Sequence, residues 1–409
     1  MPDFLTLDDI PLRGKITLVR ADLNVPVEHG RVADTSRLAR LMPTLKGLKE
    51  KGAKIVLLSH FGRPDGKPDP RYSLKPVATA LSDLWGDPIA FAEDCLGFQA
   101  ESAIKALVPG HILMLENTRF HPEEEANDPA FAQALAALGD VFVNDAFSVS
   151  HRAHASTVGI AKFLPSIAGR AMQEELEALS KALDKPERPL AAIVGGSKIS
   201  TKLGLLQNLL GKVDILVLGG GMANTFLAAK GIKIGKSIAE PDMIMTAQAI
   251  MAKAEQRNCY ILLPKDVVTA PALKADVPIK TVPIDAVPAE EMILDLGPAT
   301  ITEIKDNLSM CKTIVWNGPL GAFETPPFDR ATNEVAICVA DLTKRGRVLS
   351  VAGGGDTMAA LSRAGVSNGV SYLSAAGGAF LEWLEGIELP GVAALKQARS
   401  ERKMGKVIM

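Results

Sequence analysis

Arginine and histidine side chains recur just after short apolar runs in the first 155 residues of this 409-residue chain. Such runs are typical of buried strands, and in an open α/β sheet ligands bind beyond the carboxyl ends of the strands. The side chains found there are Arg20, Asp22, Asn24, Arg37, His60, Arg63, Arg119, His151, Arg152 and His154. One such arginine is usually a solvated loop charge, but cations at several strand ends predict a site for a small, multiply charged anion.

The stretch VRADLNVPV, residues 19–27, contributes three of these side chains. Its apolar residues alternate with Arg20, Asp22 and Asn24, which predicts a strand with one buried face, and Pro26 then ends the run. The polar face has two interpretations. It is either the solvated side of an edge strand, or it faces a ligand cleft in which Asp22 and Asn24 orient a hydroxyl group.

In the second half of the chain, glycine pairs and lysines follow the expected strands in place of arginine and histidine. In IVGGSKISTK an expected strand is followed by two glycines and then by Lys198 and Lys202, which share one face of the next helix. Glycine lets the backbone approach a phosphate closely, and a helix N-terminus offers N–H groups that favour anions. VAGGGDTM repeats the arrangement with Asp356, which either caps the helix or holds a Mg²⁺ ion that bridges nucleotide phosphates.

Two familiar phosphate-binding motifs do not fit. GIKIGKS, residues 231–237, resembles a Walker A loop but has one residue too few between its glycines. No G-x-G-x-x-G fingerprint follows an expected strand, which disfavours a dinucleotide-dependent dehydrogenase.

The elements that must position these residues alternate along the chain. Strands are expected in residues 15–25, 54–60, 111–117, 140–147, 190–196, 214–221, 260–267, 313–319 and 347–355, with amphipathic helical stretches between them. Several runs are apolar almost throughout, as in parallel sheets covered on both faces. This alternation predicts an α/β protein with doubly wound sheets.

The length predicts more than one domain. Residues 172–183 carry apolar side chains on one helical face, and Pro186 and Pro189 stop the helix. We therefore expect a first lobe at 1–175, an inter-lobe helix at 176–190 and a second lobe at 191–389. The basic tail, residues 390–409, ends on three apolar residues and is either disordered or docked on a lobe.

Composition excludes several classes of partner. The net charge of −2 argues against nucleic-acid binding, and no apolar stretch is long enough to span a membrane. The four scattered cysteines form no metal-binding spacing and indicate a reducing compartment. The N-terminus carries acids where a signal peptide needs cations, so we expect a soluble, cytoplasmic protein.

With these motifs placed, the chain resembles the phosphoglycerate kinase family. The matching segments are VRADLNVP, SHFGRPDG, LENTRF, VNDAF with HRAHAS, PERPLAAIVGGSKISTK, GGGMANTFL, WNGPLGAFE and VAGGGDT, in family order over almost the whole chain. The resemblance implies a monomer of two Rossmann-like lobes, each a parallel sheet flanked by helices, with a hinge and a central cleft. It also implies a C-terminal tail that returns to the first lobe.

The resemblance implies a reaction as well: reversible phosphoryl transfer from 1,3-bisphosphoglycerate to ADP, giving 3-phosphoglycerate and ATP with Mg²⁺. Phosphoglycerate would be bound by Asp22, Leu23, Asn24, Arg37, His60, Phe61, Gly62, Arg63, Arg119 and Arg152. The nucleotide would be bound by Lys198, Lys202, Asn317, Glu324, Gly354, Gly355, Asp356 and Thr357, with Asp356 on the metal. Arg37 and Lys202 would carry the transition-state charge.

The chain departs from the family pattern near its end. In SAAGGAF, Ala375 and Ala376 stand where the family usually has threonine and glycine, which puts contacts from this turn to the transferred phosphoryl group in doubt. Smaller departures are Phe61, Ser148, Val149 and Lys265. A nucleotide-binding regulatory protein without turnover is the alternative, but the presence of Arg37 and Lys202 favours an enzyme.

Overall fold

The computed structural model describes residues 3–403 and divides the chain into two compact units. Unit 1 comprises Met1–Glu177 and Glu388–Met409, and unit 2 comprises Ala178–Ile387. The border falls inside helix α6 (Arg170–Leu183), the helix expected near this position. Within the described residues no helix is long and apolar enough to cross a membrane.

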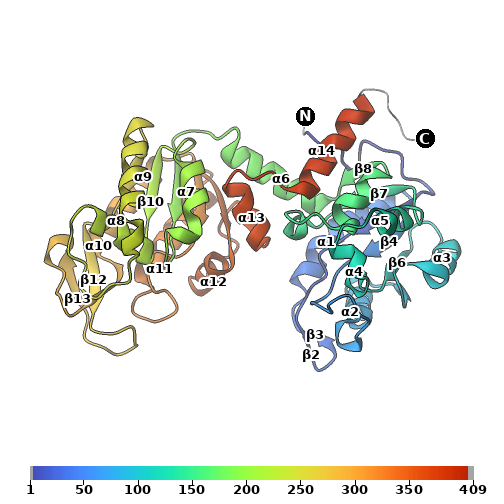
Figure 1. The fold of residues 1–409 in the computed structure, drawn as a ribbon, viewed down its shortest axis with the longest axis horizontal. Helices are drawn as coiled ribbons and strands as arrows, with labels where there is room; N and C mark the ends of the chain where they lie inside the picture. Colours follow the sequence, from blue (N-terminus) through green and yellow to red (C-terminus); the bar gives the residue numbers. More distant parts are fainter. Residues whose placement is uncertain (1–2, 404–409) are drawn as a thin grey trace. The chain divides into compact units, whose positions relative to one another are not determined.

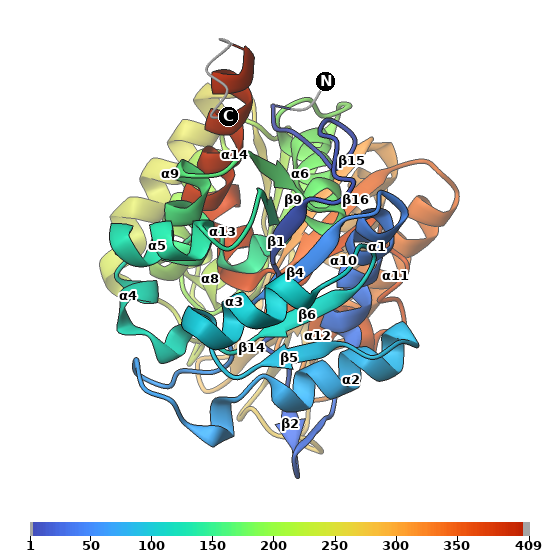
Figure 2. The same ribbon diagram turned by 90° about the vertical axis from the view of Figure 1, so that its right-hand side faces the viewer.

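Unit 1 is built on a six-stranded parallel sheet with the order β5-β6-β4-β1-β7-β8. Figure 2 shows β1, β4, β6 and β5 side by side. The strands are β1 (Ile16–Arg20), β4 (Lys54–Leu58), β5 (Ala90–Ala92), β6 (Ile112–Leu115), β7 (Val141–Asn144) and β8 (Ser166–Ala168), and β2 (Val27–Glu28) and β3 (Arg31–Val32) form a hairpin. The helices are α1 (Ser36–Glu50), α2 (Lys75–Trp85), α3 (Gly97–Ala106), α4 (Pro122–Glu125), α5 (Pro129–Ala136) and α14 (Pro390–Lys403).

Alternation along the strands explains why this sheet is covered on both faces. Val19 of β1 and Ile55 of β4 belong to a core with α1 and α2, whereas their neighbours Leu18 and Val56 belong to a second core with α3 and α5. Successive side chains point to opposite faces of a strand, so an apolar run supplies two cores at once.

Unit 2 repeats this plan with the strand order β11-β10-β9-β15-β16-β17, again parallel. The strands are β9 (Leu190–Val194), β10 (Ile215–Leu218), β11 (Tyr260–Leu262), β15 (Thr313–Asn317), β16 (Leu349–Gly353) and β17 (Tyr372–Ser374). The helices are α7 (Leu203–Leu209), α8 (Gly220–Ala229), α9 (Ile244–Gln256), α10 (Pro298–Met310), α11 (Arg330–Lys344), α12 (Gly355–Arg363) and α13 (Gly377–Leu384), as Figure 1 labels them. The predicted fold class, two α/β lobes with parallel sheets, is confirmed.

Three details differ from the sequence expectations. The first strand ends at Arg20, so Asp22 and Asn24 lie in the loop beyond it rather than on a strand face. The run 260–267 is divided between β11 and a new strand. That strand, β12 (Asp266–Ala270), pairs with β13 (Lys280–Pro283) and β14 (Met292–Leu296) in an antiparallel sheet that periodicity did not reveal.

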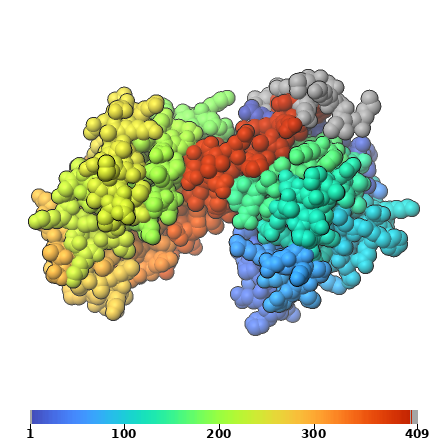
Figure 3. Space-filling model, in the orientation of Figure 1, coloured from blue at the N-terminus to red at the C-terminus, as the bar shows by residue number. Residues whose placement is uncertain are grey.

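The C-terminal helix belongs to the first unit although it ends the chain. Helix α14 packs against β8 and the neighbouring helical turns, and Arg399 donates a 2.8 Å hydrogen bond to the carbonyl oxygen of Phe4. Figure 3 shows these red residues on the same unit as the blue N-terminal segment. The three apolar residues that end the tail, which we expect to be either disordered or docked on a lobe, lie outside the described residues.

Candidate functional site

The loop after β1 gathers polar side chains at the carboxyl end of the unit 1 sheet. The Arg37 guanidinium, from the first turn of α1, donates to both carboxylate oxygens of Asp22 at 2.8 and 2.7 Å. The Ser148 hydroxyl donates to Asp22 at 2.6 Å. Arg37 is only half-buried, so its guanidinium is available to a ligand while Asp22 holds it in place.

Gly62 links this loop to the one after β4. Its N–H donates to the Asn24 side-chain oxygen at 2.9 Å, and its carbonyl accepts from Arg119 at 2.9 Å. Gly62 has a φ of 59°, and a Cβ there would lie 2.3 Å from the Tyr72 ring. Glycine is therefore required at the point where the strand-end loops meet. The N–H of the next predicted ligand, Phe61, is fixed by Asn117 at 3.1 Å.

Arg119 brings the third strand end into the same region. It follows β6 in a 3₁₀ turn, η2 (Thr118–Phe120), is largely buried, and pairs with Glu125 at 3.0 Å. Burial lowers the pKa of its guanidinium, and the positive charges of Arg152 and Arg63 lower it further. The exposed Arg63 and Arg152 thus lie within electrostatic range of Arg119, as a shared anion site requires.

His60 is buried among cations and is therefore neutral. Burial and the nearby Arg20 and Arg119 hold its pKa well below its usual range. Its Nδ1 atom lies 3.2 Å from the Arg20 guanidinium. A neutral ring adds a hydrogen-bonding group to the cluster without further positive charge.

Arg20 does not face a ligand site, so its inclusion with the anion-binding cations was wrong. It is fully buried and donates to the Ser156 hydroxyl at 2.8 Å and to the Ala21 carbonyl at 2.6 Å. Ser156 in turn donates to the buried Glu124 at 2.5 Å. Arg20 therefore supports His60 from within the core, a role that the alternating pattern could not distinguish from exposure.

In unit 2, Lys202 is held at the ends of β9 and β15. Its ammonium group donates to the Asn317 side-chain oxygen and to the Gly195 carbonyl, both at 2.6 Å. Burial lowers the pKa of Lys202 to about 8, and Asp356 opposes this shift. The Asn317 amide donates to the Gly353 carbonyl at 2.8 Å, which connects the lysine to the glycine turn after β16.

That glycine turn leads directly into α12. Gly354 has a φ of 98°, and a Cβ there would lie 2.7 Å from the Asn317 amide nitrogen. The Thr357 hydroxyl accepts from the Gly318 N–H at 2.8 Å. The α12 bonds begin where Met358 N donates to the Gly354 carbonyl, so the preceding N–H groups project from the helix end, where anions bind favourably.

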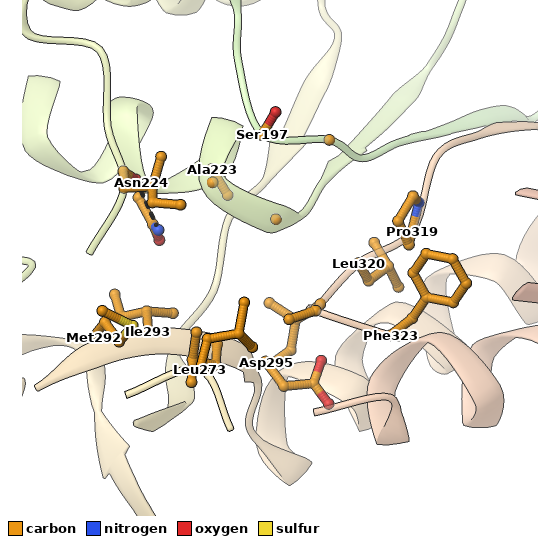
Figure 4. A pocket seen from close by; sticks show the side chains of 18 of the residues that line it. Ser197, Ala223, Asn224, Leu273, Met292, Ile293, Asp295, Pro319, Leu320 and Phe323 are labelled. Carbon is orange, nitrogen blue, oxygen red and sulfur yellow. Dashed lines mark hydrogen bonds between the residues drawn. The ribbon is translucent and has the colours of Figure 1, made fainter. Parts of the chain in front are cut away.

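A cavity of about 440 Å³ opens beside this turn. One wall is apolar and includes Leu273, Met292, Ile293, Leu320 and Phe323, and Figure 4 shows several of these side chains around the open space. The opposite wall is backbone from the glycine-rich starts of the segments after β9 and β10, and Asp356 and Glu324 line the same cavity. This combination suits a flat apolar group with a charged tail.

The apolar wall is the part of the site that sequence reasoning missed. Met292 and Ile293 belong to β14, where apolar residues look like ordinary strand core. The triplet Gly219, Gly220 and Gly221 was a usable signal, because glycines after a strand indicate close backbone approach. Lys198 is exposed and does not line the cavity.

The unusual alanines lie at the end of β17. Ala376 is largely buried, precedes α13, and donates its N–H to the Ser374 hydroxyl at 3.2 Å. The Ser374 hydroxyl thus satisfies this backbone N–H.

The fold and these two regions define an α/β protein of the doubly wound class with an arginine cluster in one unit and a glycine-walled cavity in the other. Comparisons with known proteins agree. The family model described as phosphoglycerate kinase matches residues 7–387. A phosphoglycerate kinase of Rhodospirillum centenum is 62% identical over 392 residues, which cover 96% of this chain and 99% of that protein. One of Azorhizobium caulinodans is 58% identical over 397 residues, covering 97% and 100%.

A solved structure is similar over the same span. The phosphoglycerate kinase of Coxiella burnetii superimposes with a TM-score of 0.91 at 42% identity, covering 97% of this chain and 100% of that chain. The chain belongs to the phosphoglycerate kinase family. The predicted enzyme class, a phosphotransferase that acts on a carboxyl group, is thereby confirmed. The alternative, a nucleotide-binding regulatory protein without turnover, is disfavoured.

Proposed function

We propose that unit 1 binds 3-phosphoglycerate or 1,3-bisphosphoglycerate, that unit 2 binds MgADP or MgATP, and that the chain transfers the phosphoryl group between them. The observation that carries this assignment is the Lys202 ammonium held 2.6 Å from Asn317 beside the Gly354 turn. A cation and projecting helix N–H groups at one place form a site for nucleotide phosphates.

The arginine cluster supports the assignment of phosphoglycerate binding to unit 1. Arg37, Arg63, Arg119 and Arg152 offer planar donors to a phosphate and a carboxylate, and neutral His60 adds one more polar contact. Asp22 and Asn24, between these donors, accept hydrogen bonds and suit the substrate hydroxyl. The N–H groups of Phe61 and Gly62 are fixed by Asn117 and Asn24.

The chemistry needs no proton acceptor. In one direction the attacking group is an ADP phosphate oxygen, and in the other a carboxylate, and both are already ionised. Catalysis then consists of positioning and charge stabilisation, for which we assign Arg37 and Lys202. No base has to be found among the side chains of either site.

Residues present in unit 2 fit a magnesium ion. Asp356 is exposed, lines the cavity and follows the glycine turn, and Mg²⁺ commonly takes one or two carboxylates with substrate phosphates. When bound, the ion supplies neutralisation of the nucleotide phosphates. Glu324, Lys198 and the Gly355–Thr357 backbone would contact the rest of the nucleotide, and the apolar wall its base.

We further propose a cytoplasmic monomer in which the segment 176–190 acts as a hinge, so that Arg37 and Lys202 engage one phosphoryl group. All four cysteines are free thiols, which supports a reducing compartment. Each unit has its own hydrophobic core, which supports movement as rigid bodies.

A coupled assay that follows ATP formation from 1,3-bisphosphoglycerate and ADP tests the reaction. Magnesium-dependent ATP formation is expected. If the intact, folded chain binds MgADP in a separate titration but forms no ATP, the proposed catalytic assignment is wrong even though the nucleotide site stands.

A further inference from the structure

A second cavity lies in unit 1, beyond the ends of β5 and β6. It has a volume of about 340 Å³, and none of the residues predicted to bind either substrate lines it. Four carboxylates line it, those of Asp69, Glu93, Asp94 and Glu116, against the single ammonium group of Lys75. Its charge therefore favours a cation.

Three metal-ligating side chains of different chemistry meet at this cavity. Asp94 and Cys95 are adjacent in the bend between β5 and α3, and His121 follows η2. A carboxylate oxygen, the thiol sulfur and a ring nitrogen of these residues all lie within 4.8 Å of one another. Within residues 3–403 no other set of three such side chains comes this close. Asp94 and His121 line the cavity, and Cys95 is fully buried.

The Asp94 and His121 side chains are already held in position, and Asp94 also bonds the Cys95 backbone. His121 Nε2 lies 2.8 Å from Asp94 Oδ1, and that oxygen also accepts from the Cys95 N–H at 2.6 Å. The His121 ring packs against Phe131 with a centroid distance of 5.2 Å. Little ordering of side chains would remain to oppose ligand binding.

We propose that Asp94, Cys95 and His121 bind one divalent transition-metal ion of the zinc type. Around a tetrahedral zinc ion the donor atoms lie about 3.5 Å apart, and the three donor atoms here all lie within 4.8 Å of one another. Sulfur and imidazole donors select such an ion over Mg²⁺ or Ca²⁺. Three protein ligands leave a fourth position for water, as in open zinc sites.

Metal binding here would act on a neighbouring segment. The ion ties the bend after β5 to the residue that ends η2, and η2 carries Arg119. Binding displaces the thiol proton of Cys95 to solvent. The competing explanation is an ordinary Asp94–His121 ion pair beside a cysteine that belongs to the α3–α5 core.

Cobalt(II) titration of the reduced, intact chain without nucleotide distinguishes the two. We expect one Co²⁺ per chain with a thiolate-to-cobalt charge-transfer band, and displacement of the cobalt by Zn²⁺. Cys95→Ser should abolish that band, and His121→Ala should weaken metal affinity by more than about 100-fold, since even outer-sphere changes reach that range. Both variants should keep the magnesium-supported turnover that is measured without added transition metal, because neither side chain belongs to the proposed catalytic machinery.

Cys338→Ser is the matched control, because Cys338 is the least buried of the four thiols and lies in unit 2. It should titrate like the unaltered chain. A thiolate band that persists in Cys95→Ser, or the absence of any cobalt–thiolate band in the unaltered chain, would overturn the proposal. Should Cys95→Ser fail to fold, an unchanged metal affinity in folded His121→Ala would do the same.

Discussion

The two proposed sites would bind anionic ligands by different chemical means. Unit 1 uses guanidinium groups from separate strand ends, cross-linked by Asp22, Asn24 and Gly62. Unit 2 uses one lysine, a glycine turn and the N–H groups of a helix start, beside an apolar wall. Side-chain cations suit a small substrate with two charged ends, whereas backbone donors suit a phosphate chain that must be approached closely.

The contrast extends to the charge state of the key groups. Arg37 is half-exposed, and its guanidinium is paired with the Asp22 carboxylate. Burial lowers the pKa of Lys202 to about 8. We therefore expect catalysis to depend on pH through Lys202 in unit 2.

The largest effect is expected at Arg37. Arg37→Ala should lower kcat by about 10³-fold, because arginines that stabilise a transferring phosphoryl group contribute on this scale. Nucleotide affinity should stay unchanged, since the residue lies in unit 1. Steady-state kinetics with calorimetric nucleotide titration measures both, and Arg31→Ala, an exposed arginine of the same unit, is the control. Near-normal turnover in Arg37→Ala would remove it from the reaction.

A smaller loss, about 100-fold in kcat/KM for ATP, is expected for Lys202→Ala, in the range of single transition-state donors. Unlike Arg37→Ala, this variant should also bind ATP more weakly, because the ammonium meets the nucleotide before and during transfer. Lys253→Ala, on the exposed side of α9, serves as its control. Unchanged ATP titration and unchanged turnover together would exclude Lys202 from the site.

The pH dependence of kcat/KM for ATP tests the role of Lys202 further. Because the Lys202 pKa is lowered to about 8, the side chain loses its proton and its charge as pH rises through that value. We expect kcat/KM for ATP to fall up to about tenfold per pH unit above it. Lys202→Arg should lose this alkaline limb even if its overall rate is lower. A profile of the unaltered enzyme that stays flat well above pH 8 would contradict the assignment.

The smallest expected effect concerns stability. Asp145 in unit 1 accepts from Met172 N at 3.0 Å and Asp295 in unit 2 from Ala331 N at 3.0 Å. Burial raises the pKa of Asp145 to about 6 and that of Asp295 to about 7. A folded-state pKa above the unfolded value gives stability at low pH that is lost as pH rises through the folded pKa.

Asp145→Asn and Asp295→Asn should therefore become more stable relative to the unaltered chain between pH 4 and pH 8, by on the order of 2 kcal/mol. Chemical denaturation at several pH values measures this difference. Both gains should begin near pH 4, and that of Asp295→Asn should keep growing to a higher pH than that of Asp145→Asn, because its folded-state pKa is higher. A stability difference that does not vary with pH in either variant would mean that these carboxyl groups titrate normally.

The residues of both proposed sites have recognisable sequence patterns, which differ between the two units. Arg37, Arg63, Arg119 and Arg152 stand out as cations after apolar runs, and the structure places them around neighbouring strand ends. Lys202 and the Gly354 turn stand out because glycine and lysine follow a strand. Their roles as ligand contacts remain predictions.

What periodicity could not reveal depends on three-dimensional packing. The burial of residues 19–25 does alternate as predicted, since Ala21, Leu23 and Val25 are buried. The strand nevertheless ends at Arg20. The burial of Arg20 depends on Ser156, 136 positions away. Likewise the apolar residues of β14 line the cavity only because the antiparallel sheet carries them beside the glycine turns.

The division of binding between the units is tested most directly by a crossed calorimetric titration of the intact chain with 3-phosphoglycerate and MgADP. Arg119→Ala should weaken phosphoglycerate binding by about 10- to 100-fold, the value of one charge-assisted hydrogen-bonding group, and leave MgADP affinity unchanged. Asn317→Ala should weaken MgADP binding and leave phosphoglycerate affinity unchanged. If each folded variant weakened both ligands to a similar extent, the two units would not bind separate substrates and the account would be wrong.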